Sequence, residues 1–260
     1  MHDGGGDSAD FLILSEQQAE AFDAEYHSPP EMEAKIAAIR ARHGDRSFNL
    51  LDLGGGNGVF ADRILAAFPN AQATILDVSQ ALLDRNVPSN RKELVLGSIE
   101  DMETLLAGKT FDVISVNWVL HHLVGRSHRA CGQNCLQTLE TCRRMLSPDG
   151  EIIVAENLYQ GYFESNVPSH LVYGITSVRF RPFAKLARRV GFNTAGVGVC
   201  FRSLGAWREL FGKAGLSQVD FHQGERWREE YPRKLGLRVL MIQQIRHGHF
   251  YLRKAAGLRH

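Results

Sequence analysis

Three glycines at alternate positions, Gly54, Gly56 and Gly58, follow an apolar run that contains an acid, Asp52. An amphipathic stretch begins directly afterwards at Val59, so the pattern predicts a buried strand, a tight turn and a helix. Glycine adopts backbone conformations closed to other residues and lets bare peptide groups approach a ligand. The stretch therefore predicts a turn that cradles a nucleotide-like cofactor, with a ligand-free glycine turn as the alternative.

The spacing of these glycines separates two classes of cofactor. A dinucleotide-binding fingerprint needs its third glycine where this chain has Val59, and no basic residue stands here to hold a phosphate. The pattern D-x-G-x-G-x-G instead resembles the first motif of class I S-adenosylmethionine-dependent methyltransferases, whose glycine turn lies against the methionine part of the cofactor. The resemblance implies S-adenosyl-L-methionine as the cofactor, with Asp52, Gly54, Gly55, Gly56 and Gly58 at its site.

A second acid, Asp77, ends the next apolar run and lies nineteen positions beyond Gly58. A βαβ unit places a carboxylate at about this interval beside the ribose hydroxyls of a bound nucleotide. We therefore expect Asp77, with its neighbour Val78, to bind the ribose. The alternative is that Asp77 caps a helix that begins near Ser79.

The turn from Gly97 to Asp101 resembles the Gly-Asp-x-x-Asp turn that receives the adenine in this family. Ser98 stands where the family has its first Asp. The resemblance therefore assigns adenine recognition to the Ser98 hydroxyl, the Ile99 backbone or the Glu100 carboxylate. Alternatively, Ser98 only caps the helix that follows.

The strand expected over 111–117 ends in Asn117, a further candidate for the cofactor site. Nucleic-acid amino methyltransferases carry an Asn/Asp-Pro-Pro-Tyr/Phe clamp here, and cytosine-C5 enzymes need a cysteine after a proline. The chain has neither pattern, which disfavours both classes and, with them, nucleic acid as a partner. Trp118 and the residues after it instead resemble small-molecule methyltransferases.

Plant-type phenol O-methyltransferases carry the pattern Trp-x-Leu-His-Asp-Trp at this place, and its histidine is their general base. The resemblance places that histidine at His121. A neutral imidazole titrates near physiological pH, so it can take a hydroxyl proton as the oxygen attacks the methyl sulfonium. The alternative is a histidine that packs against or covers the cofactor. Direct transfer needs no metal, and we expect none.

Aromatic residues are interspersed with basic residues between residues 158 and 202, where the chain departs from its βα pattern. An insert after the fifth strand lies over the carboxyl ends of the strands, where open α/β sheets bind ligands. We therefore expect a lid that suits a flat, acidic substrate, or equally one that packs onto the domain. The candidates for substrate contact are His122, Tyr159, Tyr162, Arg179 and Arg181.

These elements predict an α/β fold, a Rossmann-like doubly wound sheet of seven strands with the last strand antiparallel. We expect residues 1–10 to be a polar, glycine-rich flexible tail and residues 11–46 to be an N-terminal helical cap, whose Tyr26 is a candidate to close over the cofactor. Residues 47–260 form the methyltransferase domain, with the insert over 158–202. Further helices are expected over 134–145, 203–214 and 235–245, and the last strand over 249–254.

Composition limits the partners. The 260 residues carry a net charge of +1, although from residue 178 onward 17 Lys and Arg face 5 Asp and Glu. The four cysteines lack a C-x-x-C pair, and Cys135 and Cys142 fall on the apolar face of a helix. We expect reduced thiols, a cytoplasmic monomer or homodimer, a small-molecule substrate and no membrane span.

The order and spacing of the motifs predict an S-adenosylmethionine-dependent methyltransferase. Its expected acceptor is a hydroxyl or carboxyl oxygen of a small aromatic or acidic metabolite. Three alternatives stay open: an N- or C-methyltransferase of a small molecule, a protein or RNA methyltransferase that uses the basic C-terminal half, and a non-catalytic methyltransferase-like binding subunit.

Overall fold

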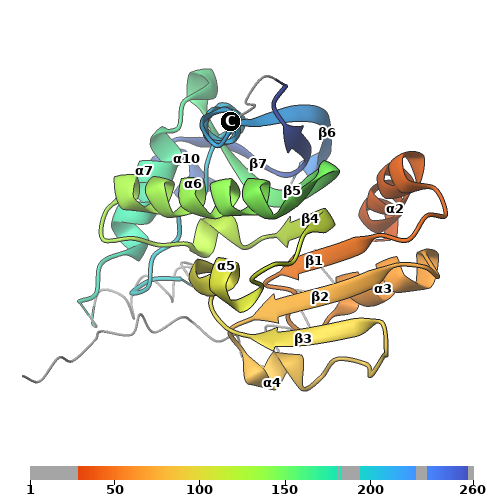
Figure 1. Ribbon diagram of the computed structural model, residues 1–260. Coiled ribbons are helices and arrows are strands. Elements are labelled where there is room, and N and C mark those ends of the chain that lie inside the picture. The colour runs from red at the N-terminus through yellow and green to blue at the C-terminus, as the bar shows by residue number, and fades with distance from the viewer. Residues whose placement is uncertain (1–28, 181, 183–193, 227–232, 257–260) are drawn as a thin grey trace, which may run out of the picture.

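The computed structural model describes residues 29–180, 182, 194–226 and 233–256 (Figure 1). Its strands form one seven-stranded sheet in the order β3-β2-β1-β4-β5-β7-β6. The strands are β1 (Asn49–Leu53), β2 (Gln72–Asp77), β3 (Lys92–Leu96), β4 (Phe111–Asn117), β5 (Leu146–Gly161), β6 (Leu216–Arg226) and β7 (Ile242–Lys254). The helices are α2 (Pro29–His43), α3 (Val59–Ala67), α4 (Gln80–Leu83), α5 (Met102–Leu105), α6 (His128–Met145), α7 (Val167–Thr176), α9 (Leu204–Lys213) and α10 (Arg233–Val239), with short 3-10 turns η1 (Ile99–Asp101), η2 (Leu120–His122) and η3 (Tyr162–Glu164).

The direction of the strands confirms the expected sheet. Strands β1 to β5 pair in parallel, whereas β7 runs antiparallel to both β5 and β6. Parallel neighbours need crossover connections, so the chain passes from one strand to the next through helices. The carboxyl ends of the parallel strands consequently meet along one edge of the sheet.

Each face of the sheet carries its own layer of core. On one face, called the α2 face here, Ile39 of α2 and Ile64 of α3 pack in a cluster with Leu50 of β1. On the other face, called the α6 face, Leu139 of α6 and Trp207 of α9 pack with residues of β1, β4 and β5 (Figure 1). Because side chains alternate along a strand, neighbouring residues of one strand serve different layers.

Three expected boundaries are corrected by the structure. The helix expected over 235–245 ends at Val239, because residues from Ile242 onward pair with the end of β5. Strand β5 itself continues to Gly161, so the insert expected from residue 158 begins after it. Helix α6 begins at His128, ahead of the expected start at residue 134, because the Ser127 hydroxyl caps its first turn.

Other expectations lie outside the described residues or are confirmed in part. Helix α2 begins at Pro29, as expected of the second half of the cap, while residues 1–28, with Tyr26, lie outside the described residues. The four cysteines are buried and unbridged, as expected of core thiols. Within the described part of the chain, no helix combines the length and apolar character needed to cross a bilayer.

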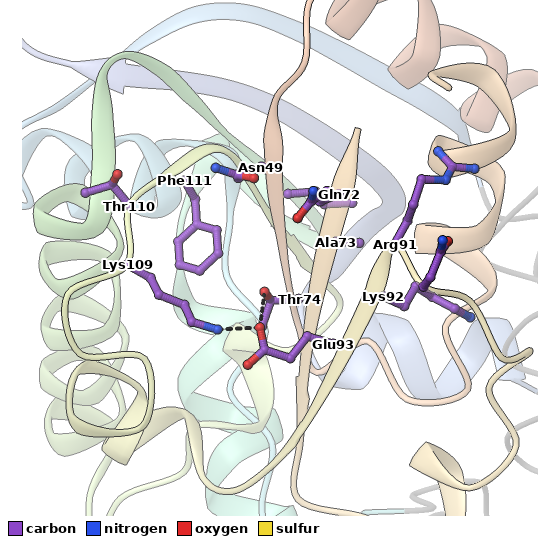
Figure 2. Close-up of a pocket in the computed structure, with 12 residues that line it drawn as sticks. Asn49, Gln72, Ala73, Thr74, Arg91, Lys92, Glu93, Lys109, Thr110 and Phe111 are labelled. Atoms are coloured by element: carbon purple, nitrogen blue, oxygen red, sulfur yellow. Dashed lines mark hydrogen bonds and ion pairs between the residues drawn. The ribbon is translucent and has the colours of Figure 1, made fainter. Parts of the chain in front are cut away.

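A hollow of about 370 Å³ lies at the amino ends of the strands, opposite the edge where the glycine turn sits (Figure 2). Its lysines are paired within the protein: Lys109 with Glu93, and Lys92 with Asp62 at 2.6 Å. Thr74 also donates to Glu93. The charges of this hollow therefore hold neighbouring strands and helices together.

Arg91 joins this hollow to the end of helix α3. Its guanidinium donates to the carbonyl oxygens of Leu65, Phe68, Pro69 and Ala71 at 3.0–3.4 Å. The last carbonyls of a helix have no partner inside the helix, so these bonds satisfy groups that would otherwise need water. Arg91 thereby fixes the passage from α3 to β2.

Replacing Arg91 with Lys keeps the charge but removes the planar fork of donors. We expect the free energy of unfolding, measured with urea, to fall by about 1–3 kcal/mol, because several carbonyls lose their partner. The control Arg129→Lys, at an exposed position of α6, should change it by less than about 0.5 kcal/mol. Equal effects of the two changes would contradict this role of Arg91.

Candidate active site

The glycine turn after β1 has the conformation that its sequence predicts. Gly54, Gly56 and Gly58 have φ angles of +67°, +51° and +77°, in the left-handed region that favours glycine. A Cβ atom on Gly54 would lie 2.5 Å from Val119, and one on Gly58 would lie 1.8 Å from the Asn86 amide oxygen. A Cβ on Gly56 would meet nothing closer than 3.5 Å, so this peptide is the open part of the turn.

Asp77 lies beside this open part, at the end of β2. Its Oδ2 accepts a hydrogen bond from the Gly56 amide at 2.9 Å, and its Oδ1 accepts one from Ser79 at 2.8 Å. A carboxylate offers about four acceptor positions, so Asp77 can still accept from a ligand hydroxyl. Burial raises the pKa of Asp77 against the opposing effect of hydrogen bonds from the Ser79, Gly56 and Val78 amides. The side chain that caps α4 is Ser79, which accepts from Leu82.

The turn after β3 lies next to Asp77, because the Gly97 amide donates to the Asp77 carbonyl at 3.0 Å. The Ser98 hydroxyl accepts from the Glu100 amide at 3.2 Å and so caps η1, which is the alternative role considered for it. Ser98 and Ile99 are half-buried, and Glu100 is exposed. The expected ribose and adenine residues thus lie on adjoining strand ends.

Asp52 and Asn117 direct their side chains to the α2 face. Asp52 is 1% exposed, and a Cβ on Gly55 would lie 2.5 Å from its Oδ2. The Asn117 amide accepts from Lys35 Nζ at 2.9 Å and donates to Ser115 at 2.6 Å. Both side chains therefore belong to a buried polar layer that supports the glycine turn from within the protein.

His121 lies on η2, three residues beyond Trp118, whose left-handed backbone (φ 52°) reverses the chain after β4. Its Nδ1 lies 2.7 Å from Oε2 of Glu156, and Oε1 of Glu156 accepts from the His121 amide at 3.3 Å. Both residues are buried, and Glu156 is 0% exposed. An Nδ1 proton donated to the carboxylate leaves Nε2 as the basic nitrogen.

Glu156 is the site residue that the sequence reasoning missed. Glu156 and Glu151 are the buried acids of β5, and Glu156 stands between Ala155 and Asn157. A charge is almost never fully buried unless it is paired, so its position in such a strand was the signal available.

Aromatic rings continue from His121 toward the expected lid. The Phe201 ring stacks on His121 with centroids 4.6 Å apart, and Tyr159 stacks on Phe201 at 4.2 Å and 2°. The His122 ring lies 4.1 Å from His121, and its side chain is exposed. The structure thus brings together two of the expected substrate residues, Tyr159 and His122, with the expected base.

The other expected substrate residues lie farther along the insert. Tyr162 on η3 and Arg179 after α7 are exposed, and Arg181 lies outside the described residues. The described insert is nonetheless anchored at this edge: Tyr173 donates to the Gly125 carbonyl at 2.9 Å. The amide of Cys200 also donates to the His121 carbonyl at 2.9 Å.

Comparison with known proteins matches residues 51–152 to the family model described as a methyltransferase domain. Cephaeline 6'-O-methyltransferase of Carapichea ipecacuanha is 27% identical over 159 residues, 56% of this chain and 41% of that enzyme. Myricetin 7/4'-O-methyltransferase 2 of Solanum lycopersicum is 24% identical over 172 residues, 65% of this chain and 41% of that enzyme. The structure of mitomycin 7-O-methyltransferase superposes with a TM-score of 0.53 at 18% identity, over 92% of this chain and 58% of that one.

The sheet order, the glycine turn and the matched domain agree. Residues 51–152 carry the match to a methyltransferase domain, which begins within β1 and ends within β5. The chain spans less than half the length of the curated relatives it matches.

The pKa of Asp52 predicts how stability depends on pH. Burial raises this pKa from 3.8 to about 7, against the opposing charge of Lys35. The native state therefore holds a proton that the unfolded chain releases, so the stability contributed at low pH is lost as pH rises through about 7. Asn at this position does not titrate.

Asp52→Asn should consequently gain stability relative to the wild type between about pH 5 and about pH 8. Urea unfolding at both pH values measures the difference, with the exposed Asp84→Asn as control. A difference in the free energy of unfolding that does not change between the two pH values would contradict a pKa of about 7 for Asp52.

Proposed function

We propose that this chain is an S-adenosylmethionine-dependent O-methyltransferase that acts on a hydroxyl group of a small aromatic metabolite. The observation that carries the proposal is the buried pair of His121 and Glu156, which lies at the edge of the sheet that also holds the glycine turn. The names of the relatives, which are O-methyltransferases of cephaeline, myricetin and mitomycin, support oxygen as the acceptor.

The residues at this edge fit an adenosyl cofactor. The open Gly56 peptide leaves room against the turn, and the Asp77 carboxylate can still accept from a ribose hydroxyl. The neighbouring turn at Ser98, Ile99 and Glu100 would hold the adenine. When bound, S-adenosylmethionine supplies an electrophilic methyl group.

The chain's own part in the reaction is to orient the acceptor and to take its proton. As the hydroxyl oxygen forms its bond to the methyl carbon and the carbon–sulfur bond breaks, the hydroxyl proton passes to Nε2 of His121. Glu156 holds the ring through Nδ1 and stabilises the imidazolium that results, so we assign it as a positioning residue. The products are a methyl ether and S-adenosylhomocysteine.

The aromatic stack favours an aromatic substrate. Phe201 and Tyr159 extend from His121 as flat rings, a surface on which another flat ring can pack beside the base. A phenol needs a base because its hydroxyl is mostly protonated near neutral pH, whereas a carboxylate is already ionised. The pair therefore favours a hydroxyl over the carboxyl acceptor.

The proposal also covers the domain organisation, location and oligomeric state of the enzyme. It includes a cap over residues 11–46, a catalytic domain over 47–260, and a role in small-molecule metabolism in the cytoplasm as a monomer or homodimer. The balanced net charge supports a partner that is not a nucleic acid.

Cofactor binding is tested by calorimetry with S-adenosylmethionine, S-adenosylhomocysteine and, as a contrast, NAD. We expect both adenosyl ligands to bind and NAD not to bind. Asp77→Ala should weaken binding by about 1–3 kcal/mol, through loss of the hydrogen bonds to ribose. Gly56→Arg should abolish it by filling the turn.

The exposed Asp84→Ala, one helix beyond Asp77, is the matched control and should bind as the wild type does. Wild-type affinity in Asp77→Ala would remove the ribose assignment. Failure of the unaltered chain to bind either adenosyl ligand would remove the proposed function.

The role of the pair is tested with a panel of phenols and carboxylic acids. His121→Ala should lower kcat about 10²- to 10⁴-fold without changing cofactor affinity, because only proton transfer is lost. Glu156→Gln keeps the shape but removes the charge, and should lower kcat and shift its pH profile.

The control His222→Ala removes an exposed imidazole on β6 and should leave kcat unchanged. A kcat of His121→Ala equal to that of the wild type at saturating substrate would reject the base. A pH profile of Glu156→Gln identical to that of the wild type would reject the positioning role.

A further inference from the structure

Three side chains from distant parts of the chain converge on the α2 face of the sheet. They are Glu31 from the first turn of α2 and His247 and His249 from β7. Oε1 of Glu31 lies 3.0 Å from Nδ1 of His247 and 3.3 Å from Nε2 of His249. One donor atom from each residue lies within 4.8 Å of the other two.

The cluster is buried but incompletely bonded. The side chains of His249, His247 and Glu31 are only 5%, 11% and 18% exposed. Among the described residues, Oε2 of Glu31 and Nδ1 of His249 have no hydrogen-bond partner, and Nε2 of His249 meets only Oε1 of Glu31. Buried polar atoms without partners are costly, so the cluster has capacity to bind a further group.

We propose that Glu31, His247 and His249 bind one divalent transition-metal ion of the zinc class. Two imidazole nitrogens and one carboxylate oxygen form a donor set that zinc prefers. Tetrahedral bonds of about 2.0–2.1 Å separate neighbouring donor atoms by about 3.3 Å. The separations of 3.0 and 3.3 Å from Oε1 of Glu31 to the two imidazole nitrogens match that spacing, and the two nitrogens lie within 4.8 Å of each other.

The neighbours of the cluster form walls around it. A Cβ atom on Gly224 of β6 would lie 3.2 Å from Oε1 of Glu31, so the β6 backbone closes one side. The Trp118 ring meets both imidazoles edge-on, with centroids 5.6 and 6.1 Å away. Three protein donors leave a fourth position for water, and the partial exposure of Glu31 places the entrance at the start of α2.

The metal site is separate from the candidate active site. His249 and His247 lie opposite Ala155 and Asn157 in the pairing of β7 with β5, whereas Glu156 lies opposite Gly248. Because directly opposed residues share a face, the cluster and Glu156 lie on opposite faces of the sheet. A bound ion would therefore act structurally, by tying α2 to β7 across 216 positions of the chain.

The site is tested on the full chain, purified without a polyhistidine tag and stripped with a chelator. After dialysis against Zn²⁺, we expect one zinc per chain by atomic emission and a zinc-dependent rise in Tm. Titration with Co²⁺ should give the visible absorption of a four- or five-coordinate ion. No methyl donor or substrate is present, so the outcome is independent of the proposed function.

Two variants remove single donors with small changes of shape, Glu31→Gln and His247→Asn. Each should weaken zinc binding by about 100-fold or more, beyond the range that changes outside the ligand set produce, and abolish the rise in Tm. Circular dichroism checks that they fold without metal. The matched control is His222→Asn, which removes an exposed imidazole opposite His249 on β6 and should bind zinc normally.

X-ray absorption of the zinc-loaded wild type gives a test that needs no variant. We expect a shell of nitrogen and oxygen that contains two imidazoles. A sulfur shell would instead place the ion at the buried thiols and overturn the proposal. No zinc binding by the wild type, undiminished binding by both variants, or equal weakening by His222→Asn would also overturn it.

Discussion

The buried ammonium of Lys35 is the interaction around which the α2 face is arranged. Lys35 is 1% exposed, yet its helix packs on an apolar layer, so its charge must be met by the sheet. Asn117 accepts its hydrogen bond, Lys35 Nζ lies over the rings of Trp118 and Phe60, and Glu31 and Asp52 supply opposing charge. Helix, glycine turn and strand β4 are thereby held in one relative position.

The two faces of the sheet contribute different side chains to the site. The α2 face holds the polar layer that supports the glycine turn, together with the proposed metal site. The α6 face holds Glu156, which fixes the His121 ring from within the core. Since neighbouring residues of one strand point to opposite faces, β5 serves both layers at adjacent positions, Glu156 and Asn157. A shift of its register by one residue would exchange them.

Much of this fold was predictable because its signals are local. The apolar runs, the glycine spacing and the acid that ends β2 predict parallel strands joined by helices, and the observed strand order confirms that prediction. The prediction was wrong where strand pairing outweighed a local pattern. The pattern of residues 242–245 predicted a helix, but these residues pair with β5 and belong to β7. Single strands cannot reveal such pairings, because the partner lies about eighty positions away.

The sequence by itself determined where the turns fall, because left-handed backbone favours the glycines at 54, 56 and 58 and the apolar run of β2 ends at Asp77. Only the tertiary structure decided where side chains point. It turned Asp52 and Asn117 toward Lys35, paired His121 with Glu156, and joined Glu31 to β7. These contacts depend on which face of the sheet each residue occupies and on which helix covers it, and neither is encoded within a single segment.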